Sequence, residues 1–378
     1  MEISPAELAR VRADIPVLAR CLFLNTGTLG PSPRPVTEAF LRAYTAWQDE
    51  GPGDPAHYQG RRAAIETARA DLASLLGVAP DEVALTTNVT EALNCVLAGL
   101  PWRAGDEVVI SDEEHPAIFV PALHLRRLGV RVRICPWERW GDGLSGYIGP
   151  RTRLLCASHV SSMTGRILPV AAVAEAAHRA GALLCLDGAQ AVGQLAIDVP
   201  ALGCDFYAFN AHKWLLAPVG SAGLVVRPQA SDALTPVWVG AGSGEVAYAE
   251  DGELALAPGA RRFEFATRNW AIGDGISAAV AYARAIGLER IAARQRALSG
   301  ALAARLADIP GASVLGGGET GIATAALRGH DGPEVQAALA AQGIITRPVR
   351  ERGAVRFSCA YFNTEDEIAR AAAAMAAI

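Results

Sequence analysis

Lysine is almost missing from this chain of 378 residues. Lysine and arginine together number 34, but Lys213 is the only lysine, so all the other cationic side chains of these two types are arginines. Arginine can replace lysine wherever a site needs only positive charge or a hydrogen-bond donor, but it cannot lose its proton and act as an amine nucleophile. Lys213 is therefore a candidate for covalent chemistry with a carbonyl compound. The ordinary alternative is a surface lysine left over in an arginine-biased chain.

Excess positive charge and long apolar runs are missing too. The formal net charge of -5 gives no basic surface for nucleic acid and no polybasic membrane anchor. No stretch reaches the roughly 18 apolar residues of a membrane span, and the charged N-terminus lacks the apolar core of a signal peptide. These absences predict a cytoplasmic protein that acts on a small molecule, without nucleic-acid or membrane partners.

Paired cysteines and a dinucleotide-binding glycine motif are also absent. Seven cysteines are scattered without a CxxC pair, so free thiols in a reducing compartment are expected rather than disulfides or a metal site. The glycine runs at 240–245 and 316–321 neither follow a strand nor open a long helix, and both are expected to be loops. A nucleotide-dependent oxidoreductase is therefore disfavoured.

The middle of the chain alternates short apolar runs with segments of helical length. This rhythm is typical of an α/β fold with a mainly parallel sheet between helices. The expected strands lie within residues 82–87, 107–112, 130–136, 153–160, 182–190, 205–212 and 223–228. After Gly287 the pattern changes to a smaller α+β unit, whose last helix is expected to start after Thr364. The predicted organisation is an N-terminal segment (1–20), a large domain (21–285) and a small C-terminal domain (286–378).

Two polar residues follow neighbouring strands of the predicted sheet. Asp187 ends the apolar run ALLCL, and Lys213 follows the next one, FYAFNA. Ligands of parallel sheets bind where the strands end, so both side chains are expected in one crevice. A Schiff-base lysine near a carboxylate is the arrangement that pyridoxal phosphate (PLP) requires, because the carboxylate keeps the pyridine nitrogen protonated. Asp187 alone would be equally well explained as a helix cap.

The segment from Cys185 to Val226 reads CLDGAQAVGQLAIDVPALGCDFYAFNAHKWLLAPVGSAGLVV. It resembles the cofactor-lysine segment of the class V aminotransferase and cysteine desulfurase family of fold-type I PLP enzymes. Six further motifs stand in the family's order: FLNTGTLGPSP, NVTEALN, DEEHPAIFVP, SHVSSMTGRILP, RRFEFATRNWAIGDGI and VRFSCAYFNTEDEI. The resemblance covers most of the chain and implies PLP as the cofactor.

The resemblance implies roles for five residues around the cofactor ring. Lys213 is expected to be the Schiff-base lysine, Asp187 the partner of the pyridinium nitrogen, and Gln190 a hydrogen-bonding partner of the ring hydroxyl oxygen. His115 matches the histidine that stacks on the ring, and Ser162 stands where many members carry an asparagine near it. Lys213, His115 and Asp187 are the expected catalytic residues.

Further matches concern the phosphate, a second subunit and the substrate. The cofactor phosphate is expected to contact Val89, Thr90, Asn210 and His212. The start of a helix near Glu91 suits such a dianion. Thr267 matches a threonine that reaches the phosphate of the partner subunit, which implies a homodimer. Arg356 matches the arginine that holds the substrate α-carboxylate by a bidentate contact.

The segment in which cysteine desulfurases carry a nucleophilic cysteine lacks one here. Residues 343–358, GIITRPVRERGAVRFS, contain no cysteine, and Cys359 is expected within a strand. The chain is therefore expected not to be a persulfide-forming desulfurase but to resemble the isopenicillin epimerase-like and carbon–sulfur lyase branch. The first choice of reaction is β-elimination from a cysteine S-conjugate, with Lys213 as the acid/base at Cα.

Other reactions use the same parts and stay open. Epimerisation needs a second acid/base, for which His57, Tyr58 and His115 are candidates. Transamination, decarboxylation and oxidative deamination differ from elimination in how the bonds at Cα are oriented, which residue types do not reveal. A regulatory protein on a decayed PLP fold is the alternative that is not an enzyme. The joint presence of Lys213, Asp187 and His115 argues against it.

Overall fold

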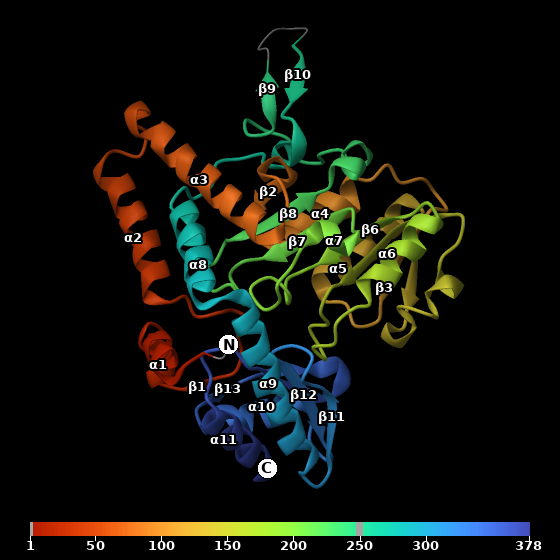
Figure 1. Cartoon of the computed structure of the whole chain (residues 1–378). Coiled ribbons are helices and arrows are strands. Elements are labelled where there is room, and N and C mark those ends of the chain that lie inside the picture. The colour runs from red at the N-terminus through yellow and green to blue at the C-terminus, as the bar shows by residue number, and fades with distance from the viewer. Residues whose placement is uncertain (1–2, 247–251) are drawn as a thin grey trace.

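The computed structural model describes residues 3–246 and 252–378, and its larger lobe contains a seven-stranded sheet (Figure 1). The strand order is β2 (Val83–Thr86), β8 (Ala222–Val226), β7 (Phe206–Asn210), β6 (Leu183–Asp187), β5 (Thr152–Ser158), β3 (Glu107–Ser111) and β4 (Arg131–Cys135). In this described sheet β8 runs antiparallel to both of its neighbours, β2 and β7, and the other pairs are parallel. The predicted mainly parallel sheet is therefore confirmed, and the seven strands occur where the apolar runs predicted them.

Alternating side chains along the strands separate this lobe into two hydrophobic cores. Leu184 and Leu186 of β6 enter one core, and Cys185 between them enters the other. The first core is covered by α3 (Pro55–Leu76), α6 (Val170–Arg179) and α8 (Ile272–Ile286), and the second by α4 (Val89–Gly99) and α5 (Pro116–His124). Because both faces of the sheet are covered, the strand ends are the parts left to contact a ligand.

The smaller lobe is an antiparallel four-stranded sheet packed against helices. Its strand order is β11 (Ala312–Gly316), β12 (Ile322–Leu327), β15 (Ala354–Ser358) and β14 (Arg347–Val349). The helices are α9 (Leu288–Ala307), α10 (Gly332–Ala341) and α11 (Glu365–Ala376), which share a core with these strands. Thr364 caps α11 by accepting a hydrogen bond from the Glu367 N–H, as predicted.

The N-terminal part of the chain returns to this smaller lobe. After α1 (Pro5–Ala13), the short strand β1 (Leu22–Phe23) pairs in parallel with β13 (Ile344–Ile345). Asn25 then bridges to Ser358 at the end of β15. Residues at the start of the predicted large domain thus join the C-terminal sheet, and the boundaries at residues 20 and 285 stay a prediction.

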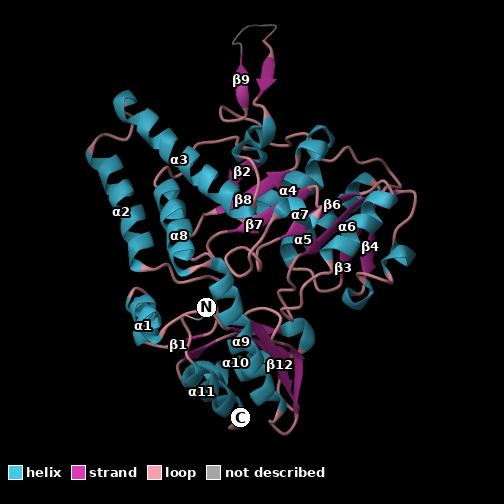
Figure 2. Cartoon of the chain, viewed as in Figure 1, coloured by secondary structure: helices cyan, strands magenta, loops and turns pink. Residues whose placement is uncertain are grey.

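Two features project from the large lobe, as Figures 1 and 2 show. α2 (Arg34–Asp49) packs with α3 against α8, and β9 (Gly244–Val246) pairs with β10 (Leu254–Leu256) in a hairpin. Residues 240–245 therefore run into β9 rather than forming a loop throughout. Residues 316–321 begin at the last residue of β11 and otherwise connect it to β12. The remaining helix of this lobe, α7 (Val199–Leu202), is a single turn.

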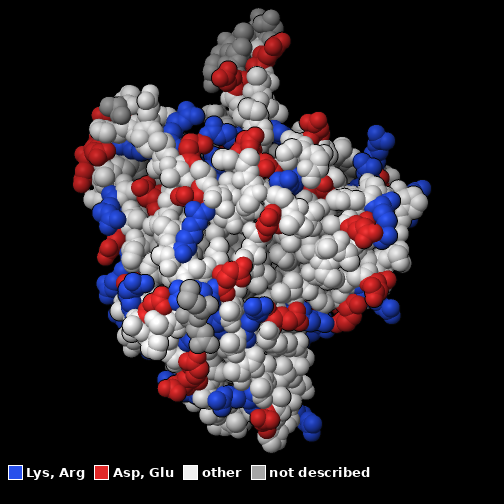
Figure 3. Space-filling view, viewed as in Figure 1, with Lys and Arg blue, Asp and Glu red and all other residues white. Residues whose placement is uncertain are grey.

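The surface carries both charge signs. Figure 3 shows acidic and basic side chains interspersed over the face in view. Within the described ranges, the structure contains no helix that is both long enough and apolar enough to cross a membrane. All seven cysteines are free; six of them are buried and Cys21 is half-buried.

Candidate active site

Asp187 and Lys213 face each other in one cavity at the ends of β6 and β7. Asp187 is the last residue of β6, and Lys213 follows the last residue of β7, Asn210, by three positions. The cavity is lined by Val89, His115, Ser158, Val160, Ser162, Asp187, Ala189, Gln190 and Lys213. The structure thus brings six of the predicted site residues together in the large lobe: Val89, His115, Ser162, Asp187, Gln190 and Lys213.

The amine and the carboxylate perturb each other. Withdrawal from water is the main reason that the pKa of Lys213 is lowered from 10.5 to about 8; Asp187 opposes the shift, and Arg356 and Arg347 contribute to it. Burial raises the pKa of Asp187, although Lys213 and the Ala189 N–H, which donates to Oδ1 over 2.8 Å, both favour its ionised form. An amine with a lowered pKa is neutral in part near pH 8, which a carbonyl nucleophile requires.

His115 presents an uncharged ring to this cavity. It is the N-cap residue of α5, where Nδ1 accepts a hydrogen bond from the Ala117 N–H at 3.1 Å. Burial, with smaller contributions from the positive charges of Lys213 and Arg347, lowers the pKa of His115 to about 4. At neutral pH the imidazole is therefore a flat, neutral surface whose rotation is restricted by its own helix cap.

The N-terminus of α4 forms the end of the site at which the phosphate is expected. The Val89 N–H donates to Oδ1 of buried Asn210 over 2.9 Å, which ties the helix start to the end of β7. Thr90 is exposed beside it. Nδ1 of His212 lies 3.1 Å from the Ser221 carbonyl oxygen, so this ring is held from the other side. The Val89 and Glu91 N–H groups are bonded to Asn210 and Asn88, which leaves the Thr90 N–H and the Asn210 side-chain N–H groups as donors of the kind that bind an anion.

Gln190 is more constrained than its expected role requires. Its Nε2 donates to the Gly27 carbonyl oxygen over 2.9 Å, and its Oε1 accepts from Nε1 of Trp214 over 2.8 Å. The amide nitrogen has two hydrogens, so one remains for a ring oxygen. A side chain on Gly27 would lie only 2.9 Å from Gln190 Oε1, which explains the glycine at this position.

Arg356 is a buried cation aimed from the smaller lobe toward the site. From β15, one terminal nitrogen donates to the Ser162 carbonyl oxygen over 2.7 Å, and the other donates to Thr28 Oγ1 over 3.1 Å. Its Nε is buried and has no partner among the described residues. Burial lowers the pKa of Arg356 to about 9, and the neighbouring cross-strand Arg347 contributes. A guanidinium in this state favours an arriving carboxylate.

Thr267 lies elsewhere in this chain. It is exposed and lines a groove of about 700 Å³ between α3 and the β9–β10 hairpin, together with Tyr58 and Trp270. His57, near the start of α3, lies 3.5 Å from Asp54 and 3.9 Å from Glu50. Thr267 and Tyr58 are not among the residues that line the Lys213 cavity.

Sequence reasoning missed Glu114, which is buried directly behind the cavity. Its carboxylate accepts hydrogen bonds from the hydroxyls of Ser111, at 2.5 Å, and Ser158, at 2.6 Å, and from the Ser158 N–H. Burial raises the pKa of Glu114 to about 7, and nearby Asp187 contributes. The acidic pair just before His115 was the available signal.

These residues suit PLP. A partly neutral amine can bind the aldehyde, Asp187 is a buried carboxylate across the cavity, and His115 offers a flat ring. The start of α4 at Val89 borders the same cavity, and its positive dipole end suits a phosphate.

Comparison with known proteins decides the assignment. The family model described as "Aminotransferase class-V" matches residues 22–371, which is most of the chain. The chain belongs to the class-V aminotransferase family. As a member of this family with fold-type I architecture, it is a PLP-dependent enzyme, as predicted.

Its relatives carry several names. It is 35% identical over 383 residues to the isopenicillin N epimerase of Streptomyces clavuligerus, and the match covers 94% of each chain. It is 32% identical over 382 residues to a probable cysteine desulfurase of Methanothermobacter thermautotrophicus, covering 95% of this chain and 94% of the relative. It spans only 57% of the length of a probable cysteine desulfurase of Mycolicibacterium paratuberculosis, to which it is 33% identical.

A solved structure supports the fold. A cystine C–S lyase in complex with its reaction product, cysteine persulfide, superimposes with a TM-score of 0.90 at 30% identity, covering 96% of this chain and 99% of the other. The roles of individual residues remain proposals.

Proposed function

We propose that this enzyme is a carbon–sulfur lyase that carries out β-elimination on cysteine-type substrates, including S-conjugates and cystine. The observation that carries this proposal is a lysine of lowered pKa in the cofactor cavity, together with the lack of any cysteine among the described residues that line this cavity. Elimination needs one acid/base at Cα and a good leaving group at Cβ, but no second nucleophile.

PLP, when bound, supplies an electron sink that acidifies the substrate Cα–H bond. With PLP bound, Asp187 would hold the proton on the pyridine nitrogen, and His115 would pack on the ring. The N-terminus of α4, with Asn210 and His212, would hold the phosphate. Arg356 binds the substrate α-carboxylate through its terminal nitrogens, and its buried Nε is a further donor.

Lys213 is the proton carrier in the proposed reaction. Its neutral Nζ takes the proton from Cα, and the resulting electron pair forms the Cα–Cβ double bond while the C–S bond breaks. The sulfur leaves as a thiolate and is protonated. Hydrolysis of the remaining unsaturated amino acid gives pyruvate and ammonia, so the overall reaction consumes water and needs no oxidant.

The β14–β15 connection supports direct release of sulfur. It forms a short turn of helix, η8 (Arg350–Arg352), and Arg352 is ion-paired with Glu113 at 3.3 Å. Cys359, which follows the opposite end of β15, is fully buried, and burial raises the pKa of its thiol. Neither feature provides a mobile thiolate.

We further propose a homodimer in which Thr267 reaches the cofactor phosphate of the partner subunit. Its exposure in a groove outside the Lys213 cavity supports a role across an interface rather than within one chain.

Epimerisation is the second candidate, favoured by the 35% identity to isopenicillin N epimerase. It needs a group on the opposite face of Cα from Lys213. His115 lines the same cavity, but its ring is the one proposed to stack on the cofactor.

The test is a product analysis of the holoenzyme with L-cystine, L-cysteine and an S-alkyl cysteine. Thiol or persulfide and pyruvate are expected in equal amounts, with a Lys213→Ala variant as the blank. Cα–H exchange without pyruvate would replace the lyase by an epimerase. An amino group appearing on an added keto acid would replace it by an aminotransferase.

A further inference from the structure

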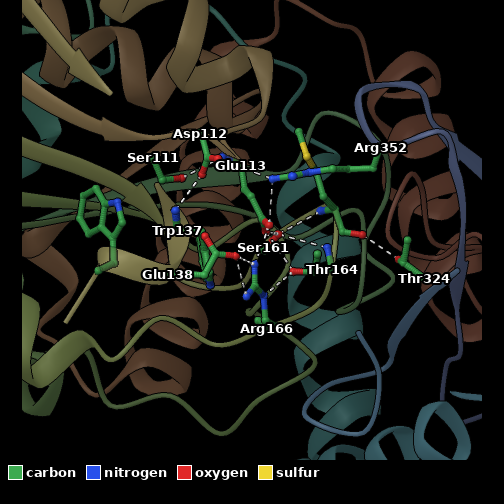
Figure 4. A network of polar contacts seen from close by, with 12 residues as sticks. Ser111, Asp112, Glu113, Trp137, Glu138, Ser161, Thr164, Arg166, Thr324 and Arg352 are labelled. Carbon is green, nitrogen blue, oxygen red and sulfur yellow. Dashed lines mark hydrogen bonds and ion pairs between the residues drawn. The ribbon is translucent and has the colours of Figure 1, made fainter. Parts of the chain in front are cut away.

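Glu113 is a buried carboxylate at the junction of the two lobes, outside the cofactor cavity. It follows β3 and is only 1% exposed. Its oxygens accept hydrogen bonds from four side chains: Ser161 Oγ at 2.5 Å, Thr164 Oγ1 at 3.0 Å, Arg166 at 2.7 Å and Arg352 at 3.3 Å. Figure 4 shows these groups converging on it, and they are called here the Glu113 cluster.

The cluster joins two segments that come from different lobes. Ser161, Thr164 and Arg166 belong to the turn after β5, in which the Ser161 hydroxyl also accepts from the Met163 and Thr164 N–H groups. Arg352 comes from η8 of the smaller lobe. A fully satisfied buried carboxylate of this kind holds its partners in one geometry.

The same turn contacts Arg356 and the small sheet. The Ser162 carbonyl oxygen accepts from Arg356 over 2.7 Å, and the Met163 carbonyl oxygen accepts from Thr324 Oγ1 over 2.7 Å. Close packing reinforces this, because a side chain on Gly316 would lie 2.1 Å from the Thr164 carbonyl oxygen. The turn therefore holds one terminal nitrogen of Arg356 in place, while Thr28 holds the other.

We infer that Glu113 is a positioning residue for substrate binding: by clamping the 161–166 turn to the smaller lobe, it orients Arg356 toward the substrate α-carboxylate. This inference rests on the carboxylate-binding role proposed for Arg356. Glu113 does not line the Lys213 cavity, and its hydrogen bonds lead toward Arg356 through the 161–166 turn, so its loss is expected to weaken the carboxylate contact more than the reaction of the amine with the cofactor.

The test compares two ligands of the holoenzyme by absorbance titration of the bound cofactor. L-alanine has a carboxylate but no leaving group, and ethylamine is the same molecule without the carboxylate. Glu113→Gln keeps the size of the side chain but removes its charge, and is expected to weaken alanine binding about tenfold while leaving ethylamine binding unchanged. Arg352→Ala, which alters the more exposed end of the link, is expected to act in the same direction and serves if Glu113→Gln does not fold.

Two controls separate the possible failures. Glu138→Gln changes an exposed carboxylate that also contacts Arg166, at 3.2 Å, but not Glu113, and is expected to bind both ligands normally. Arg356→Lys shows how far the affinity for L-alanine falls when the carboxylate contact itself is impaired. If Arg356→Lys weakens alanine selectively but Glu113→Gln and Arg352→Ala do not, positioning by Glu113 is overturned and the proposed function stands. If none of them does, the Arg356 contact fails, and the inference with it.

Discussion

The segments after β7 and β15 each carry a group of nucleophile type, a half-buried amine and a buried thiol, and withdrawal from water has opposite consequences for the two. After β7, Lys213 is withdrawn from water and its pKa falls to about 8. After β15, Cys359 is withdrawn from water and the pKa of its thiol rises. Burial disfavours the charged form in both cases, but the reactive form of an amine is neutral whereas that of a thiol is the anion. Burial therefore makes the amine of Lys213 more reactive and the thiol of Cys359 less reactive.

This difference teaches how a chain can keep the cofactor chemistry of its family without a sulfur acceptor. The lysine lies in the same cavity as Asp187, whose negative charge opposes the effect of burial on it. The cysteine lies in the core of the smaller lobe, and its N–H is bonded to the Gly321 carbonyl oxygen over 2.7 Å. Whether Lys213 or Cys359 can react thus depends on the charges around the side chain and on its access to a ligand, and not on residue type alone.

Replacing Lys213 by arginine is expected to have the largest effect, because it tests directly whether this amine must become neutral. The Lys213→Arg variant keeps a positive charge near Asp187 but cannot become neutral, so we expect elimination to fall on the order of 10³-fold or more. The visible absorbance of the lysine-bound cofactor is also expected to disappear. Both are measured on the purified protein after incubation with PLP.

A matched control is the reverse exchange on the surface. Arg179→Lys alters an exposed arginine of α6 that pairs with Glu175, and it is expected to leave activity unchanged. If Lys213→Arg retained the absorbance band, another group would hold the cofactor, and the role proposed for Lys213 would be wrong.

The pH dependence of cofactor uptake tests whether the pKa of Lys213 is lowered, and its expected effect is smaller than that of Lys213→Arg. Because the pKa of Lys213 is lowered to about 8, its neutral fraction rises about tenfold per pH unit below that value and is nearly complete above it. The uptake rate of PLP by the cofactor-free enzyme is therefore expected to rise up to about pH 8 and then level off. Stopped-flow absorbance measures it. A rate that still rises at the ordinary lysine pKa of 10.5 would show that the amine is not activated.

The sequence allowed Lys213, Asp187 and the sheet to be predicted because their signals are local. A single lysine, an apolar run ending in aspartate and repeated strand-length segments need no knowledge of distant contacts. The Glu113 cluster has no such signal, since Glu113 and Arg352 are separated by 239 positions and meet only after the lobes assemble. The same applies to the two-residue pairing of β1 with β13, and to the antiparallel direction of β8, which its apolar pattern does not encode.

Removing Cys359 is expected to have the smallest effect. If the thiol is silent, Cys359→Ala retains elimination activity within about twofold, although loss of a buried sulfur destabilises the fold by about 1 kcal/mol. The assay is therefore made well below the unfolding temperature, with thiol and pyruvate release measured separately. A loss of sulfur release that leaves Cα–H exchange intact would mean that the cysteine accepts sulfur after all. Cys359 would then have to become exposed during turnover, and the difference between its thiol and the Lys213 amine would hold only for the enzyme without substrate.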